Sequence, residues 1–386
     1  MLAAVIIIIF FIPYTASGFA ACGKLFSSLF GMNYMTAMII SAVVIVAYTT
    51  AGGFFAASAT DFVQSIIMTV AIVFVLVFST ISAGGIDVVV ENAKALPGYL
   101  SLTASYIEDT GKSEPYNLLH IITTLSWGLG YFGMPHILLR FMAIEDEKKL
   151  KLSRRVASVW VVIAMAMAVL IGIVGRALSN TGLVDQLHGN DTETIIVRVA
   201  HLLSTYGAFP AIMAGLILAG ILASTMSTAD SQLLAAASSV SENILREAFH
   251  LKISEKKSML AARLTVIGIA ILGIIIARNP DSSVFGIVSF AWAGFGAAFG
   301  PLVICSLFWK RTTLPGAIVG MVSGGAMVFI WKYLIKPIGG VFGIYELLPA
   351  FLVGLVLMVI VSLCTKAPSK EITDEFDRVK AMGKAK

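Results

Sequence analysis

Charged residues are scarce in this sequence, and their scarcity excludes most soluble proteins. Only 13% of the 386 residues are charged, against roughly 25% in soluble domains, and 58% are apolar. Such a composition cannot form the surface of a soluble enzyme or the basic face of a folded nucleic-acid-binding protein. The net charge of +5 needs no nucleic-acid partner, because the cytoplasmic loops of membrane proteins collect Lys and Arg.

Cysteines and nucleotide-binding motifs are also sparse. Cys22, Cys305 and Cys364 are odd in number and form no CxxC pair, so neither a disulfide framework nor a zinc site is indicated. The glycine-rich segment 291–301, AWAGFGAAFGP, lacks the GK[ST] ending of a phosphate-binding loop, which disfavours an ATP-driven pump. An outer-membrane barrel is excluded as well, because its strands alternate apolar and polar residues over about 10 positions.

Long uncharged runs are what the sequence does contain. Residues 25–60 and 62–86 carry no charge, and each run exceeds the ~20 residues with which a helix crosses a bilayer. We therefore predict an all-α polytopic membrane protein. Trimming the runs at Gly, Pro and charge clusters gives ten spans, about 2–22, 34–56, 62–83, 118–142, 156–176, 205–240, 259–277, 283–309, 314–334 and 346–365.

The distribution of Lys and Arg predicts the orientation of these spans. One side of the membrane receives 19 of them and the other side 8, so we expect both termini in the cytoplasm of a cell-membrane protein. The polar tail 366–386 is then a solvated cytoplasmic end or a docking helix. The outer loops, about 84–117 and 177–204, hold most of the acidic residues, including Glu193, and we interpret these as a solvated face without necessary chemistry.

The fourth span contains SWGLGYFGMPH at 126–136, where three glycines and Pro135 interrupt a helix at membrane depth. Proline removes a backbone donor, and broken backbone is tolerated in a bilayer only where protein buries it or where it lines a cavity. This pattern indicates a discontinuous helix at a midplane binding site, with Trp127 and Tyr131 on one face. The alternative is a kinked helix whose glycines allow close packing.

The sixth span carries the polar stretch STMSTADS at 224–231. Ser224, Ser227, Thr228 and Ser231 recur at spacings of three and four, so their hydroxyls share one helix face. Oxygen ligands of this kind suit a small hard cation such as Na⁺. Asp230 is a carboxylate deep in this span, and ionisable groups within the membrane are functional candidates. The alternative is that the hydroxyls bond only to carbonyls of their own helix.

Two further residues allow more than one interpretation. Asp61, at the predicted cytoplasmic start of the third span, could cap its helix or face the polar stripe of the sixth. His136 is isolated, and we interpret it as a packing residue in preference to a ligand or proton relay.

Six strings, in this order, resemble the sodium:solute symporter family and its sodium/proline symporter branch. They are FFIPYTASG (10–18), GGFFAASATDFVQ (52–64), SWGLGYFGMPHILLRFMA (126–143), MSTADSQLL (226–234), NPDSSVFGIVSFAWAGFGAAFGP (279–301) and GIYELLPAF (343–351). The resemblance extends over essentially the whole chain. It implies a LeuT-type inverted-repeat fold, with solute and Na⁺ bound near the midplane and moved by alternating access.

The resemblance also implies a domain layout. Residues 1–365 would form the transmembrane symporter domain, with an incomplete first repeat at about 2–83, a second repeat at about 118–309 and two appended helices at about 314–365, followed by the tail 366–386. The family chain begins earlier, so its leading helix and first two core helices would lie before Met1. We therefore expect that Met1–Lys386 alone does not catalyse Na⁺-coupled transport.

Carried over position by position, the resemblance implies two ion sites and a solute site. The hydroxyls of Ser227 and Thr228 and the carbonyl of Ser224 would bind Na⁺, and Asp61, Asp230 and Ser231 correspond to a possible second Na⁺ site. Proline binding and its gate would involve Trp127, Tyr131, Pro135 and Tyr14. An Asp stands at position 230, where relatives with the second site usually have a hydroxyl.

These observations favour a Na⁺-coupled importer of L-proline in the lipid bilayer, which is not an enzyme. A Na⁺ symporter for another small carboxylate or amino acid is an alternative, because the preceding helices would help to line the pocket. Two alternatives of other classes are the membrane input module of a sensor and an inactive, truncated gene product.

Overall fold

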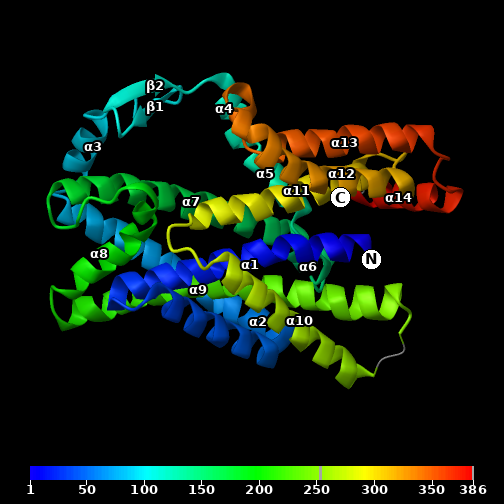
Figure 1. Cartoon of the computed structure of the whole chain (residues 1–386), viewed down its shortest axis with the longest axis horizontal. Helices are drawn as coiled ribbons and strands as arrows, with labels where there is room; N and C mark the ends of the chain where they lie inside the picture. The colour runs from blue at the N-terminus through cyan, green and yellow to red at the C-terminus, as the bar shows by residue number, and fades with distance from the viewer. Residues whose placement is uncertain (252–253, 385–386) are drawn as a thin grey trace.

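A computed structural model describes residues 1–251 and 254–384 of the chain. Its main helices and strands are α1 (Leu2–Phe30), α2 (Tyr34–Ser82), α3 (Ile86–Lys94), β1 (Ala104–Ile107), β2 (Lys112–Pro115), α4 (Leu118–Leu125), α5 (Trp127–Gly130), α6 (Pro135–Met142), α7 (Leu150–Asn180), α8 (Ile195–Ser204), α9 (Ala208–Ser238), α10 (Glu255–Ile276), α11 (Val284–Phe308), α12 (Leu314–Ile330), α13 (Leu347–Cys364) and α14 (Lys370–Lys384). The fold is a bundle of long apolar helices, as the composition predicts (Figure 1).

Nine segments within the described residues are helical, long and apolar enough to cross a membrane, whereas the sequence predicts ten spans. The difference lies at 118–142, where the chain forms short helices in place of one long one. The predicted spans 34–56 and 62–83 belong to one 49-residue helix, α2. Glycines at 52 and 53 do not end this helix, because tertiary packing routinely overrides a weak local propensity.

The break in the fourth span is confirmed at the predicted place. Helix α5 passes into a 3₁₀ turn (Tyr131–Gly133), Met134 is extended, and Pro135 begins α6. The residue before a proline is disfavoured in the helical region, so Met134 is where the helix stops. The close-packing alternative applies as well, because a Cβ on Gly133 would lie 2.2 Å from the Phe295 carbonyl oxygen of α11.

Helix α1 runs through the middle of the bundle. Figure 1 shows it between α11 on one side and α9 and α10 on the other, and it also packs against α2. Phe10 and Phe11 of α1 are buried against Phe295 of α11. Gly294 leaves room for this contact, since a Cβ there would lie 2.0 Å from the Phe10 ring. Such small residues let helices approach closely in a membrane, where packing drives association.

The segment 84–117 and the C-terminal tail contain regular secondary structure, whereas the sequence predicts a solvated loop and a polar tail. The predicted loop 84–117 contains α3 and an antiparallel hairpin of β1 and β2. The tail forms the helix α14, and Asp377 on it pairs with Lys310 at the end of α11. This ion pair places α14 against the membrane domain, which agrees with the docking-helix alternative.

Candidate functional site

The polar stripe of the sixth span lies on α9, and its hydroxyls converge on one carbonyl. Ser227 Oγ and Thr228 Oγ1 donate to the Ser224 carbonyl oxygen over 3.2 and 3.0 Å. Ser231 Oγ donates in the same way to the Ser227 carbonyl oxygen over 3.0 Å. The bonds within the helix are therefore present, although Ser231 also accepts a hydrogen bond from Arg140, and the bonds of Ser227 and Thr228 gather three oxygen atoms around Ser224.

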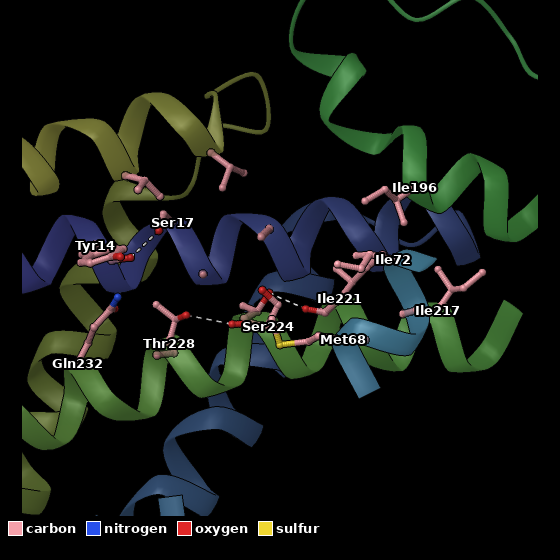
Figure 2. A pocket seen from close by; sticks show the side chains of 18 of the residues that line it. Tyr14, Ser17, Met68, Ile72, Ile196, Ile217, Ile221, Ser224, Thr228 and Gln232 are labelled. Carbon is pink, nitrogen blue, oxygen red and sulfur yellow. Dashed lines mark hydrogen bonds between the residues drawn. The ribbon is translucent and has the colours of Figure 1, made fainter. Parts of the chain in front are cut away.

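A cavity of about 430 Å³ lies beside these oxygens, between α1, α2, α8, α9 and α11. Its lining is mostly apolar, and no residue described there has a charged side chain. Figure 2 shows Tyr14 of α1 on the opposite wall from Ser224 and Thr228 of α9. The polar residues that line it are Tyr14, Ser17, Ser224, Thr225, Thr228 and Gln232.

We call Ser224, Thr228 and Gln232 the neutral cluster. The oxygens of Ser224 and Thr228 are uncharged, hard ligands, and they face a space large enough for a small solute. Na⁺ prefers ligands of this kind, so the residues present fit the ion that the sequence predicts. Ser227 does not line this cavity, although its hydroxyl shares the Ser224 carbonyl.

The predicted solute-binding residues are only partly brought together. Tyr14 lines the main cavity, and Trp127 lines an adjoining cavity of about 450 Å³ that shares Ile221 and Val284 with it. Tyr131 is 45% exposed and makes an edge contact with the Trp292 ring. Tyr131 and Pro135 line neither of these two cavities.

Trp127 is held by a stack of aromatic rings. The centroid of its ring lies 5.4 Å from the ring centroid of Phe285, 5.2 Å from that of Trp292 and 5.8 Å from that of Tyr345. Trp292 Nε1 also donates to the Trp127 carbonyl oxygen over 3.0 Å. This stack fixes the broken segment to α11 and places an aromatic wall beside the adjoining cavity.

The residues of the predicted second ion site come together around a guanidinium group. We call Asp61, Arg140, Asp230 and Ser231 the charged cluster. Arg140 forms an ion pair with Asp61 and donates to Ser231 Oγ over 2.8 Å. Asp61 thus faces the stripe of α9, as one interpretation predicts; because it lies inside α2, it does not cap a helix.

Asp230 is fully buried on the other side of this cluster. It accepts a hydrogen bond from the Tyr48 hydroxyl over 2.9 Å and one from Ser231 Oγ over 3.3 Å. The cation beside Asp61 and Ser231 is therefore an arginine of α6. The second Na⁺ site stays a prediction.

A second cavity, of about 550 Å³, reaches the charged cluster from the side of α6. His136, Arg140 and Ser231 line it. The His136 ring lies 5.8 Å from the Tyr14 ring, which lines the main cavity. His136 packs against the rings of Phe11 and Tyr14, but its Nδ1 has no hydrogen-bond partner among the described residues, so the packing interpretation stays a prediction.

Glu193, predicted to be solvated, joins the helices α1 and α11. It accepts hydrogen bonds from Lys24 Nζ over 2.9 Å, from Ser283 Oγ over 2.8 Å and from the Val284 and Phe285 amides over 3.1 and 3.2 Å. Burial alone would raise the pKa of Glu193, but the lysine and these donors lower it below its usual value. The carboxylate therefore caps α11 and holds the end of α1.

Sequence reasoning overlooked Gln232 of the neutral cluster, Arg140 of the charged cluster and Tyr48, which bonds to Asp230. Gln232 follows Thr228 by one helical turn, and that spacing on the same face could have identified it. Arg140 adjoins a basic segment in the sequence, and Tyr48 lies in an apolar run without a periodic signal.

Comparison of the sequence with known proteins identifies a family. The profile of the sodium:solute symporter family matches residues 1–324. The chain is 38% identical to "Sodium/proline symporter 2" of Staphylococcus saprophyticus, over all of this chain and 73% of that protein. It is 38% identical to "High-affinity proline transporter PutP" of Bacillus subtilis, over 97% of this chain and 74% of that protein.

A solved structure agrees on the fold. The substrate-bound, outward-open structure of a Na⁺-coupled sialic acid symporter matches 95% of this chain and 75% of its own, with a TM-score of 0.74 and 19% identity. The fold is thus LeuT-like, and the chain is a multi-pass membrane protein. By its sequence profile and its relatives, the chain belongs to the sodium:solute symporter family.

Proposed function

We propose that this chain carries out Na⁺-coupled import of L-proline by alternating access. The relatives named as proline transporters support the solute, and the family supports the coupling to Na⁺. The observation that carries the proposal is the meeting of the Ser224 and Thr228 oxygens with an uncharged, largely apolar cavity. A cation ligand set and a space for a small solute thus lie side by side.

In this proposal, Na⁺ is held by the Ser224 carbonyl and by the hydroxyls of Ser227 and Thr228. To bind the ion, the two hydroxyls turn their lone pairs toward it while they keep the helix bonds that gather them. We assign one Na⁺ to the chain. The charged cluster is not assigned a second one, since Arg140 already neutralises Asp61.

The pyrrolidine ring of proline needs apolar and aromatic walls, which Tyr14 provides in the main cavity and Trp127 in the adjoining one. Tyr131 and Pro135 act at the break of the fourth span, where α5 ends and α6 begins. Exposed ends of broken helices in membrane transporters bind charged groups of solutes and ions, so we assign this segment to the gate over the solute.

The proposed layout follows the expectation from sequence. Residues 2–83 and 118–309 belong to two repeats that move against each other, 314–365 are appended helices, and 366–386 are a cytoplasmic tail. Both termini face the cytoplasm; they lie toward the same end of the bundle in Figure 1. Binding of Na⁺ favours an outward-open state with higher affinity for the solute, and this differential affinity is the coupling.

A second candidate solute is another small carboxylate with an apolar body. The cavity has no charged side chain among its described lining residues that would distinguish the proline amine from other groups. Competition by a panel of small amino acids and carboxylic acids ranks these candidates.

Uptake of labelled L-proline into liposomes tests the proposal. The chain is reconstituted as printed and, in parallel, joined to the part of the Bacillus subtilis relative that lies outside the matched region. We expect concentrative uptake under an inward Na⁺ gradient and none under a K⁺ gradient in the joined protein. Equal uptake in Na⁺ and K⁺, or none in either protein, refutes the proposal. Uptake by the chain as printed would refute only the expectation that it is insufficient alone.

A further inference from the structure

Gln232 is a buried amide whose hydrogen-bonding capacity is only half used. It is 1% exposed, and it lies on α9 four residues after Thr228. Its Oε1 accepts a hydrogen bond from Thr15 Oγ1 of α1 over 3.3 Å. Its Nε2 has no hydrogen-bond partner within the part of the chain that the structure describes.

The unpaired end of this amide belongs to the wall of the main cavity. Figure 2 shows the Gln232 side chain reaching from α9 toward Tyr14 on α1, with its nitrogen foremost. Leaving a buried donor without a partner is unfavourable, because it has lost its bonds to water without replacement. A ligand that brings an acceptor into the cavity removes this penalty.

The surroundings determine the acceptor that fits. No described lining residue carries a positive side chain, so a carboxylate here has no arginine or lysine to pair with. The Gln232 amide supplies a fixed donor, and the oxygens of Ser224 and Thr228 supply a cation position about 6 to 12 Å back along the helix, since Thr228 and Ser224 precede Gln232 by four and eight residues that rise about 1.5 Å each. An anionic group between them is attracted to both.

We propose that Gln232 Nε2 donates a hydrogen bond to the carboxylate of the transported solute, which makes Gln232 a specificity-determining residue for small, largely apolar carboxylates. Thr15 holds the amide oxygen and so keeps the NH₂ group turned toward the cavity. This inference rests on the proposed function, because it assigns a role within the same solute site. It adds a residue and a chemical group that the aromatic walls and the Na⁺ ligands do not supply.

Binding of labelled L-proline to the purified protein tests the inference, with L-prolinamide as competitor. Gln232→Leu keeps the side-chain size and removes the donor, and Gln232→Glu replaces the donor by an acceptor. Gln64→Leu is the control, since Gln64 is a half-buried glutamine on α2 and does not line this cavity. Thermal unfolding of each variant shows that it is folded, and Gln232→Asn serves where the leucine variant does not accumulate.

We expect Gln232→Leu to weaken proline binding about 10- to 100-fold, the usual effect of losing a hydrogen bond to a charged group. The Na⁺ concentration for half-maximal binding at saturating proline should change by less than about threefold. The reason is that the lost hydrogen bond to the proline carboxylate weakens proline binding to the same degree at every Na⁺ concentration. Gln232→Glu should lose most of the preference for proline over prolinamide, because its carboxylate accepts from the amide of prolinamide. Gln64→Leu should bind as the wild type does.

Three results separate the possible failures. If folded Gln232→Leu binds proline as tightly as the wild type, the inference is wrong. If proline and prolinamide lose affinity equally, Gln232 has only a structural role, and the inference is equally wrong. If the wild type does not bind proline in Na⁺, the proposed function itself fails.

Discussion

The neutral cluster and the charged cluster are neighbours on α9, and they differ in what their polar groups contact. In the neutral cluster, Gln232 Nε2 has no partner among the described residues, and Ser224 and Thr228 line a cavity. In the charged cluster, Arg140 bonds to both Asp61 and Ser231, although Asp61 Oδ1 also has no partner among the described residues. We therefore propose ligand binding for the neutral residues, while the charged residues connect α2, α6 and α9.

This contrast reverses a common expectation for membrane proteins. Ionisable residues in a span are functional candidates by default, and Asp230 is a candidate for that reason. A buried charge is unfavourable unless it is paired, and Asp61 already has Arg140 as its partner cation. Uncharged hydroxyls and amides can remain partly unpaired at lower cost, so they are available to ligands.

The largest expected effect comes from removing the cation of the charged cluster. Arg140→Gln leaves Asp61 without its partner, and removing one member of a buried ion pair costs roughly 3–5 kcal/mol. Because Arg140 is 38% exposed, we expect about 2 kcal/mol of lost stability, measured by thermal or denaturant unfolding in detergent.

Two variants control this prediction. Lys149→Gln breaks an exposed pair with Glu145 and should change stability by less than about 0.5 kcal/mol. The double variant Asp61→Asn/Arg140→Gln should recover part of the loss, since it also removes the unpaired charge. An Arg140→Gln protein as stable as the wild type would show that the charged cluster does not hold the helices together.

The next effect concerns the proposed Na⁺ site. Ser227→Ala and Thr228→Ala each remove an oxygen from the proposed Na⁺ site, and we expect the Na⁺ concentration for half-maximal proline uptake to rise about 10-fold, equivalent to about 1.4 kcal/mol. Thr265→Ala is the control, because Thr265 makes the same bond to its own helix on α10 and does not line the cavity. An unchanged Na⁺ dependence in both variants would remove the site assignment.

A smaller effect distinguishes the two aromatic residues of the broken span. Trp127 lines a cavity and stacks on three rings, whereas Tyr131 is 45% exposed and lines neither the main nor the adjoining cavity. We expect Trp127→Ala to lower proline uptake about 5-fold per folded molecule, as the loss of about 1 kcal/mol of aromatic contact predicts. Tyr131→Ala should lower it less. Quantifying membrane protein beside uptake separates transport from folding, and a stronger effect of Tyr131→Ala would contradict the placement.

The smallest effect is expected for Glu193, which joins α1 and α11. The lowered pKa of Glu193 means that its carboxylate stabilises the fold above the usual pKa of a glutamic acid and loses this contribution as the pH falls through the lower, folded-state pKa. Glu193→Gln should therefore be less stable than the wild type at pH 7, by at most about 1 kcal/mol. The difference should vanish toward pH 3. Glu114→Gln, at an exposed strand position, is the control, and a difference that grows with acidity would contradict the assignment.

The features that the sequence predicted well are those set by local periodicity. Hydroxyls three and four residues apart had to share a face of α9, and glycines followed by Pro135 had to interrupt a helix. Neither conclusion needed information about the rest of the chain. The same reasoning was wrong at Gly52 and Gly53. Two glycines predict a break between two spans there, but the helix α2 continues through them.

The features that the sequence did not predict depend on contacts between distant segments. Arg140 adjoins a basic loop in the sequence, but its guanidinium lies inside the bundle beside Asp61. Glu193 has the setting of a solvated loop residue, yet it caps a helix that begins about 90 residues later. Gln232 continues the polar face of α9, but its position in the sequence does not show that its amide contacts Thr15 of α1. In each case the partner is decided by how the helices pack.

Locating the bound cation tests the central comparison most directly. Crystals of the protein grown with L-proline and with Tl⁺ in place of Na⁺ would show the ion by its anomalous scattering. We predict a peak at the cavity side of Ser224 and Thr228, with Arg140 still bound to Asp61. A peak between Asp61 and Ser231, with Arg140 displaced, would contradict the account.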